Sequence, residues 1–409
     1  MVEAGRKQRT YRYELFRAVA AGMMETAGTT FLLLIAVRWF HAGAVAKAVI
    51  AGAGSVGLLI SPLVVTWVMA GGWSVSTAAS RILAAGAAAF AIAAAVPLLP
   101  VFTTCCVLGM ASTAAIIPLL TQMYQDNYPE RERGRLFSRA FMVRIGTAAG
   151  FSKVTGDLLT GNIQYFPWLL LVFATAMGFG SFCLARCPTG PVPPDGGSHP
   201  LRALRFLRED QLFRRTLICW MLMGFANLMM LPLRVEYLAN PRYGHQLTVG
   251  MIALLVGVIP NLARLVMSPI WGHLFDRMNF FALRVTLNCG FAIGILTFFT
   301  SDSVPGMVLG AVVFGISNAG GDVAWSLWVT KFAPPGRVAD YMAVHTFLTG
   351  VRGVLAPLAA FLAVGTFTLG WMAGLSAALI IGATLMLLPE IKWGKKARPS
   401  SALVEEVSE

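Results

Sequence analysis

Charged residues are scarce in this chain: Asp, Glu, Lys and Arg together make up 12% of its 409 residues, whereas 57% are hydrophobic. So few charges cannot cover the surface of a water-soluble protein of this size. The mean hydropathy of +0.70 leads to the same conclusion. The composition therefore excludes a water-soluble fold and predicts that lipid is the main solvent, in which helices or closed barrels satisfy the backbone.

Several chemical signatures are also missing. The six cysteines have neither disulfide-framework nor metal-ligand spacing, and the five histidines are scattered along the chain. No Walker loop of the form Gly-x-x-x-x-Gly-Lys-Ser/Thr is present, so ATP is not the direct energy source. We therefore expect no metal site and no cofactor, and an enzyme embedded in the membrane is a disfavoured alternative.

Apolar segments long enough to cross a bilayer run almost from end to end. Segments of roughly 20 apolar residues predict helices, because membrane strands are shorter and alternate in polarity. The sequence predicts an all-α membrane protein with twelve transmembrane helices. They cover residues 13–37, 44–70, 77–98, 101–125, 137–161, 165–186, 213–238, 247–272, 279–300, 304–328, 338–364 and 366–388.

The chain divides near residue 190, where Pro and Gly are too frequent for a helix. We predict an N-terminal tail (1–12), a six-helix bundle (13–187), a linker (188–212), a second six-helix bundle (213–390) and a C-terminal tail (391–409). The halves echo each other: Leu-Leu-Ile-Ser-Pro-Leu at 58–63 resembles Leu-Val-Met-Ser-Pro-Ile at 265–270. Such repeats predict two pseudo-symmetric bundles with a site between them.

The net charge of +13 is unevenly distributed. If the N-terminus is cytoplasmic, most Lys and Arg fall in cytoplasmic segments, and only Arg38, Lys47 and Arg242 fall outside. This positive-inside pattern predicts a multi-pass protein of the plasma membrane (a bacterial inner membrane) with both termini in the cytoplasm. The basic residues then contact lipid head groups, so we expect no nucleic-acid partner.

Two loop segments carry a family resemblance. Gly272-His-Leu-Phe-Asp276-Arg277 resembles the G-x-x-x-D-R loop of the major facilitator superfamily, and Tyr128 to Arg135 resembles its basic loop between spans 4 and 5. With the two six-helix halves, the resemblance covers about residues 12 to 390. It implies a secondary transporter, usually monomeric, whose inner gate includes Gly272, Asp276, Arg277, Arg135 and Arg337. Span 4 lacks the arginine of drug–proton antiporters, which weakens a multidrug assignment.

Ionisable groups within the predicted spans cost at least ~2.5 kcal/mol each, so they require partners or a wet cavity. Lys153 and Asp157 are four residues apart and predict a local ion pair. The resemblance implies that all the spans with such groups surround or flank the central cavity. The full set is Arg17, Glu25, Arg144, Lys153, Asp157, Arg234, Arg264, Asp322, His345 and Arg352.

Depth and side-chain chemistry suggest roles for these groups. Glu25, near mid-membrane, is the preferred proton-coupling residue, with Asp322 and His345 as further candidates; His345 is equally consistent with a packing role. Arg352 is the preferred substrate anchor, because a guanidinium binds carboxylate or phosphate through two parallel hydrogen bonds. Asn227, Arg144, Arg264 and Trp325 complete the predicted substrate site, although Arg144, Arg264 and Asp322 are equally consistent with gate salt bridges.

Bases outnumber acids within the spans, which favours an anionic substrate. We therefore predict a secondary active transporter that moves a small, anionic organic solute by alternating access, driven by a proton gradient. An acidic site can bind H⁺ or Na⁺, so Na⁺ is the alternative coupling ion. A drug or metabolite exporter of the same fold is the alternative, and a non-transporting sensor is a disfavoured one.

Overall fold

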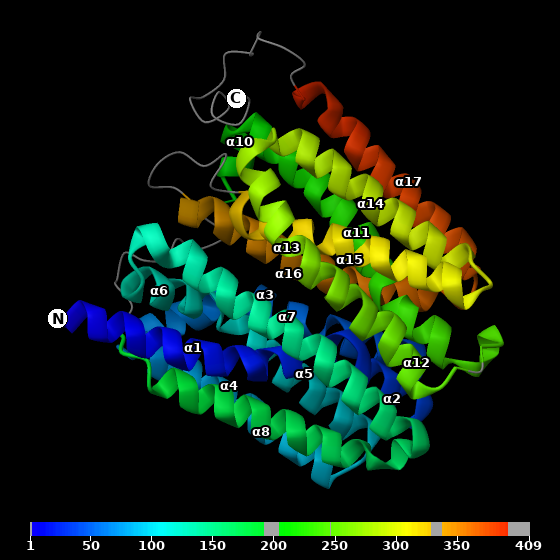
Figure 1. Cartoon of the computed structure of the whole chain (residues 1–409), viewed down its shortest axis with the longest axis horizontal. Helices are drawn as coiled ribbons and strands as arrows, with labels where there is room; N and C mark the ends of the chain where they lie inside the picture. The colour runs from blue at the N-terminus through cyan, green and yellow to red at the C-terminus, as the bar shows by residue number, and fades with distance from the viewer. Residues whose placement is uncertain (1, 192–203, 246, 329–337, 392–409) are drawn as a thin grey trace.

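The structure is a computed structural model that describes residues 2–191, 204–245, 247–328 and 338–391. Long helices dominate it and lie in two groups (Figure 1): blue to green helices from the N-terminal half, and green to red helices from the C-terminal half. The two groups meet along one interface, which holds the features that bear on function.

The N-terminal half is built from six long helical segments. The first is continuous from α1 to α2 and contains a π-helical turn, η1. The elements are α1 (Val2–Thr26), η1 (Ala27–Phe31), α2 (Leu32–Arg38), α3 (Ala44–Ala70), α4 (Val75–Ala95), α5 (Leu99–Ala115), α6 (Ile117–Asn127), α7 (Glu130–Gly161), η2 (Ile163–Tyr165) and α8 (Phe166–Ala185).

The C-terminal half repeats this organisation, and its second long segment also contains a π-helical turn, η4. Its elements are α10 (Phe206–Glu209), α11 (Gln211–Ala239), η3 (Pro241–Tyr243), α12 (Val249–Ala253), η4 (Leu254–Val258), α13 (Ile259–Arg277), α14 (Phe280–Thr300), α15 (Val304–Leu327), α16 (Val338–Ala363), α17 (Leu369–Leu387) and η6 (Leu388–Glu390). The echoed Ser-Pro pairs place Pro62 inside α3 and Pro269 inside α13.

Local sequence explains where several helices begin. Side-chain oxygens of Ser74, Asp210, Ser303 and Thr368 accept hydrogen bonds from backbone N–H groups in the first turns of α4, α11, α15 and α17. These bonds satisfy donors that have no partner within the helix. The capping residues therefore fix where these four helices begin.

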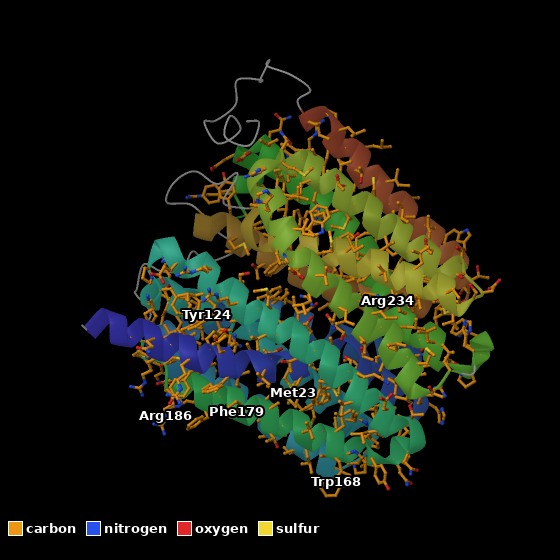
Figure 2. All side chains as sticks on the ribbon, viewed as in Figure 1. Met23, Tyr124, Trp168, Phe179, Arg186 and Arg234 are labelled. Carbon is orange, nitrogen blue, oxygen red and sulfur yellow. The ribbon has the colours of Figure 1, made fainter. Side chains whose placement is uncertain are left out.

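Among the described residues, eleven helical segments are long and apolar enough to cross a membrane. The remaining predicted span lies in α7, which is long enough but less apolar because it carries Arg144, Lys153 and Asp157. Large apolar side chains such as Trp168 and Phe179 are exposed on α8 and point away from the bundle (Figure 2). An apolar outer surface is the expected face toward lipid, which supports the prediction of twelve spans.

Two helix pairs make most of the interface between the halves. The first pair is α3 and α16, and in the second, α7 packs against α12, η4 and α13. A Cβ added to Gly350 of α16 would lie 2.7 Å from the backbone nitrogen of Leu59 of α3. Glycine therefore allows these helices of opposite halves to pack backbone against backbone.

The predicted spans and the observed helices differ in detail. The first helix begins at Val2, so residues of the predicted tail extend span 1, and the π-helical turns were not predicted. Residues 192–203 of the predicted linker, Arg337 and all but the first residue of the C-terminal tail lie outside the described residues, as does the side chain of Asp276.

Candidate functional site

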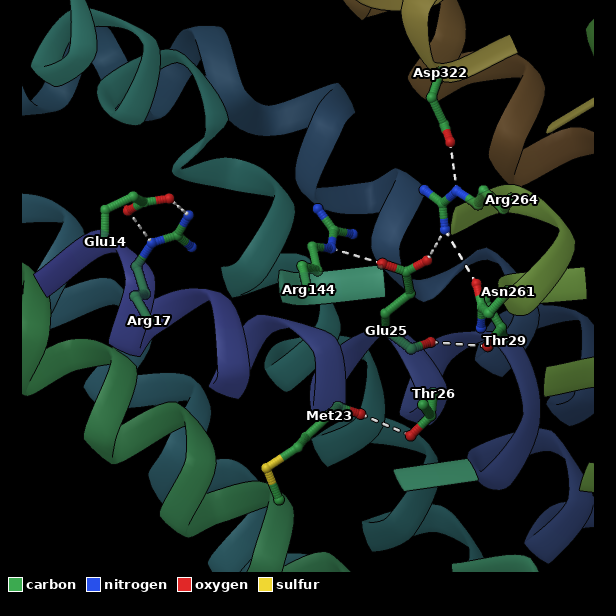
Figure 3. Close-up of polar contacts among 10 residues, drawn as sticks. All are labelled: Glu14, Arg17, Met23, Glu25, Thr26, Thr29, Arg144, Asn261, Arg264 and Asp322. Atoms are coloured by element: carbon green, nitrogen blue, oxygen red, sulfur yellow. Dashed lines mark hydrogen bonds and ion pairs between the residues drawn. The ribbon is translucent and has the colours of Figure 1, made fainter. Parts of the chain in front are cut away.

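An ionic network joins the two halves near the middle of the interface (Figure 3). Glu25, at the end of α1, accepts a hydrogen bond from Arg144 Nε of α7 at 2.6 Å and another from Arg264 of α13. Arg264 also donates from Nε to Asp322 of α15 at 2.5 Å and from Nη1 to Asn261 at 3.3 Å. One carboxylate is therefore shared by guanidinium groups from opposite halves.

The network is buried at its centre and open at its edges. The side chains of Glu25 and Arg264 are 9% and 7% exposed, whereas Asp322 is 25% and Arg144 is 40% exposed. The ring of Phe141 lies within 6 Å of both guanidinium carbons, at 5.8 Å from Arg144 and 5.3 Å from Arg264. The charges of the two arginines and the two carboxylates cancel. Solvent reaches this group of ions at Arg144, its most exposed side chain.

The two π-helical turns lie beside this network. η1 begins two residues after Glu25, η4 ends six residues before Arg264, and the two turns contact each other across the interface. Thr29, within η1, donates its hydroxyl to the backbone oxygen of Glu25 at 2.9 Å. Single π turns within α-helices are frequent at functional sites. Both helices that carry the central ion pair are therefore irregular next to it.

At one end of the interface, hydrogen bonds and an ion pair connect the halves directly; we call this the closed end. Lys47 Nζ lies 2.7 Å from Glu236 Oε1, and both side chains are buried. Arg38 donates to the backbone oxygen of Leu247 at 3.1 Å. The ion pair joins the start of α3 to α11, and the hydrogen bond joins the end of α2 to the loop after α11. Both therefore hold the two halves together.

At the opposite end, which holds the chain's N-terminus and which we call the N-terminal end, the ion pairs found among the described residues stay within one half. Lys7 lies 3.1 Å from Glu132, and both belong to the N-terminal half. The hydrogen bond from Lys7 lowers the pKa of Glu132 below its usual range. Asp210 accepts a hydrogen bond from the Tyr341 hydroxyl at 3.0 Å within the C-terminal half. Among the described residues, the ion pairs that join the halves therefore lie at the closed end and in the central network.

A second group of buried polar residues lies inside the C-terminal half, around the indole of Trp220 on α11. Arg284 of α14 lies over the Trp220 ring at 3.8 Å, and Arg352 of α16 donates to the Trp220 backbone oxygen at 2.6 Å. His345 of α16 meets the same indole edge-on, with 5.5 Å between ring centroids. We call Trp220, Arg284, His345 and Arg352 the tryptophan–arginine cluster.

The structure divides the predicted site residues between these two places. Glu25, Arg144, Arg264 and Asp322 come together in the central network. Arg352 and His345 belong instead to the tryptophan–arginine cluster, and Trp325 lies beside it, 5.6 Å from the His345 ring. Arg352 and Glu25, the preferred substrate anchor and the preferred proton-coupling residue, therefore belong to different groups of polar side chains.

The other predicted site residues are members of neither group. Asn227 is half-buried on α11, and its Oδ1 atom has no hydrogen-bond partner among the described residues. A Cβ at Gly272 would meet no atom within 4 Å, and Arg277 is exposed. Arg135 is exposed and pairs with Glu132 of its own helix at 3.3 Å. The predicted local pair of Lys153 and Asp157 forms, at 2.6 Å, and is exposed.

Sequence reasoning missed two pieces of this arrangement. Lys47 and Glu236 lie at the ends of predicted spans, where charged residues are ordinary and carry no signal of pairing. Arg284 counts among the Lys and Arg that the positive-inside pattern assigns to the cytoplasmic side, but its side chain is buried in the C-terminal half. A position in the middle of a span identifies a charged residue that needs a partner. It does not identify a charged residue near the end of a span whose side chain turns inward.

Two helical halves that share an ionic network at their interface define a multi-pass membrane transporter. The family follows from the sequence: residues 76–357 match the Major Facilitator Superfamily. This match covers more than half of the chain, so the chain belongs to that family. A comparison with curated proteins gives no match.

Solved structures of transporters share the fold. A mutant form of the nucleoside transporter NupG is 12% identical, with a TM-score of 0.75, over 94% of this chain and 100% of that one. A D-xylose-proton symporter is 14% identical, with a TM-score of 0.66, over 95% and 96%. The human organic anion transporter MFSD10 is 17% identical, with a TM-score of 0.61, over 94% and 99%. At these identities the likeness concerns the fold.

Proposed function

We propose that this protein is a proton-coupled secondary transporter of small organic anions, and that the central network is its substrate and coupling site. The observation that carries the proposal is the sharing of Glu25 between Arg144 and Arg264, which belong to different halves. An anion that binds both arginines must replace Glu25. Binding of substrate and contact between the halves thus depend on the same two guanidinium groups.

The charge balance of the network supports coupling to a proton. Arg144 and Arg264 are balanced by Glu25 and Asp322. Protonation of Glu25 removes one negative charge and leaves a net charge of about +1, which one monovalent anion neutralises. Guanidinium groups bind carboxylates through short, charge-assisted hydrogen bonds, so a carboxylate of the solute can take the place of Glu25. One proton and one monoanion then move together without net charge transfer.

The exposure of the network supports an access route. Arg144 is the most exposed of the four side chains, so an incoming anion meets this guanidinium first. With the N-terminus in the cytoplasm, as the distribution of Lys and Arg favours, the closed end faces outward and the N-terminal end faces the cytoplasm. The structure then corresponds to an inward-facing state of an alternating-access cycle. Gly272, Asp276 and Arg277 lie in the last turns of α13, and Arg135 lies near the start of α7, at the end that would face the cytoplasm, consistent with an inner gate.

Transport by reconstituted protein tests the proposal. Uptake of monocarboxylates, phosphate esters, sugars and organic cations into proteoliposomes is measured with and without a pH gradient, and with a Na⁺ gradient. We expect anions to be accumulated only with the pH gradient. The Arg264→Gln variant should lose roughly 30-fold or more in apparent affinity, because removing one partner of a buried charged pair costs about 2 to 5 kcal/mol.

The Glu25→Gln variant separates binding from coupling. It mimics the protonated carboxylate, so we expect it to bind anions and to exchange them, but to lose accumulation driven by the pH gradient. Lys153→Gln, on the same helix as Arg144 but in an exposed pair, is the matched control and should transport normally. Unchanged proton-driven uptake by Glu25→Gln, or uptake of cations in preference to anions, would contradict the proposal.

A further inference from the structure

The tryptophan–arginine cluster concentrates positive charge where no negative charge balances it. Arg284 is 2% exposed and Arg352 is 9% exposed. The recorded contacts of their guanidinium groups are with the Trp220 indole, the Trp220 backbone oxygen and the thioether of Met223 at 3.5 Å. Among the described residues, no carboxylate lies within ion-pair distance of either arginine. This contrasts with the central network, in which each arginine has a carboxylate partner.

Physical chemistry makes such a pair of arginines costly. An arginine side chain does not lose its proton in a protein, so burial cannot be relieved by neutralisation. An isolated buried ion costs several kcal/mol even after relaxation of its surroundings, and a second ion of the same sign adds repulsion. Thioether and indole groups are weak partners for a cation compared with a carboxylate. A negative charge in the cluster would offset this cost.

Hydrogen-bond donors of the cluster are also unused. Within the part of the chain that the structure describes, Arg352 Nε is buried without a hydrogen-bond partner, and both ring nitrogens of His345 lack one, although His345 is 0% exposed. A neutral imidazole offers one N–H donor. A Cβ at Gly224 would lie 2.0 Å from Arg352 Nη1, so glycine is needed for the guanidinium to lie against α11. His345 and Arg352 of α16 therefore hold hydrogen-bond donors in fixed positions, next to the guanidinium of Arg284.

The walls of the cluster restrict the size and polarity of what it can hold. The His345 ring is enclosed by Trp220, Trp325 and Trp328, with centroid distances of 5.5, 5.6 and 5.1 Å. The edges of aromatic rings carry partial positive charge and tolerate an anion. Trp325 lies one helical turn from Asp322, so the cluster is a neighbour of the central network but contains none of its four residues.

We propose that the tryptophan–arginine cluster binds a small monovalent inorganic anion of halide size. The anion accepts hydrogen bonds from Arg352 and His345 and balances the charge of Arg284 and Arg352. Burial of all three side chains favours a small ion over an organic solute. The proposal is independent of the proposed function, because it concerns a site inside one half rather than the site shared by both.

Tryptophan fluorescence and thermal unfolding of the purified full-length protein test this site. Sodium chloride, bromide or iodide replaces sodium methanesulfonate at constant ionic strength. We expect chloride to raise the melting temperature with saturation, and iodide, a heavy-atom quencher, to quench the fluorescence along a saturable curve. Both Arg352→Gln and Arg284→Gln should raise the apparent dissociation constant for chloride by roughly tenfold or more, because each removes a charged partner of the anion.

Two matched variants locate the effect. Arg234→Gln removes another buried arginine of the C-terminal half, whose guanidinium lies over Phe314 rather than Trp220, and should keep the chloride response. Arg144→Gln disables the central network and should keep it as well. Linear quenching with no chloride-dependent melting shift in the wild-type protein would overturn the proposal, even if the variants failed to fold. Loss of the response in Arg144→Gln but not in Arg352→Gln would assign the anion to the central network.

Discussion

The two ends of the interface between the halves use charge in opposite ways. At the closed end, Lys47 and Glu236 pair across the halves, and both are buried. At the N-terminal end, Lys7 and Glu132 pair within one half, and each is about one third exposed. Ion pairs of similar geometry therefore have different consequences. The buried pair resists separation of the halves, whereas the exposed pair leaves the two halves independent.

The difference follows from solvent. Exposed ion pairs contribute little because water screens them and the side chains lose entropy on pairing. Breaking a buried pair leaves an uncompensated charge in a medium that solvates it poorly. An alternating-access cycle must open the closed end, so the Lys47–Glu236 pair has to be solvated during that step. The central network lies between these extremes, with a buried core and exposed edges.

Among the variants considered, replacement of Lys47 should have the largest effect on how firmly the two halves are held together. Lys47→Met leaves Glu236 buried without its cationic partner, and the Asn240 side chain still donates to it at 2.8 Å. Loss of one partner of a buried pair costs the closed arrangement about 3–5 kcal/mol. We expect the closed end to open. The measurement is the distance distribution between spin labels at Val45 and Phe367, which are exposed near that end on opposite halves; longer distances should dominate in the variant.

A double variant is the control for that experiment. Lys47→Met combined with Glu236→Met removes both charges and should restore much of the short-distance population, because a buried pair can be replaced by apolar groups at little cost. Equal distance distributions for wild-type and Lys47→Met protein would show that the pair does not hold the closed end.

An intermediate effect is expected in the middle of the interface. Gly350→Ala places a Cβ 2.7 Å from the Leu59 backbone nitrogen, so α3 and α16 must move apart. Overpacking of this kind typically costs about 1–3 kcal/mol, more than the gain of about 1 kcal/mol in helix propensity. We expect a lower melting temperature and slower transport. Gly374→Ala, where no atom lies within 4 Å of the added Cβ, should be neutral or stabilising; the same behaviour in Gly350→Ala would argue against close packing of α3 and α16.

The smallest effect is expected at the N-terminal end. Lys7→Gln removes the hydrogen bond that lowers the pKa of Glu132, so that pKa should return toward its usual value. A lowered pKa in the folded state stabilises the fold above the ordinary pKa of Glu, and this contribution disappears as the pH falls through the lowered value. Melting temperatures of wild-type and Lys7→Gln protein should differ slightly at pH 7 and converge in acid. A large loss of transport in Lys7→Gln at pH 7 would contradict the view that this exposed pair leaves the two halves independent.

Much of the fold could be predicted because hydropathy is a local property. The predicted span 44–70 coincides with α3, and each predicted span contains a long helix. The π-helical turns η1 and η4 could not be predicted in this way. They face each other across the interface, and such irregularities depend on contacts between helices that are far apart in the sequence.

The candidate site was predicted less completely, because charge within a span reveals that a partner is needed but not which one. Glu25 and Arg264 were each identified from their position in a span, yet their pairing depends on how two helices are rotated and placed. Arg352 illustrates the limit. Its depth in the membrane favours a place in the substrate site between the halves, but residues inside the C-terminal half lie at the same depth, and the Arg352 side chain is one of them. Arg284 lies near the start of a span, where an arginine that turns inward has the same sequence signal as one that faces the lipid head groups.

The π-helical turns have a mechanical consequence for the site. Each one accommodates a residue more than a regular turn holds, and a change back to regular winding would rotate the adjoining helical segment by about 100°. Glu25 adjoins one such turn, and Arg264 lies shortly after the other. Such a rotation of the segment on one side of either turn would swing the carboxylate away from the guanidinium, while the segment on the other side kept its packing.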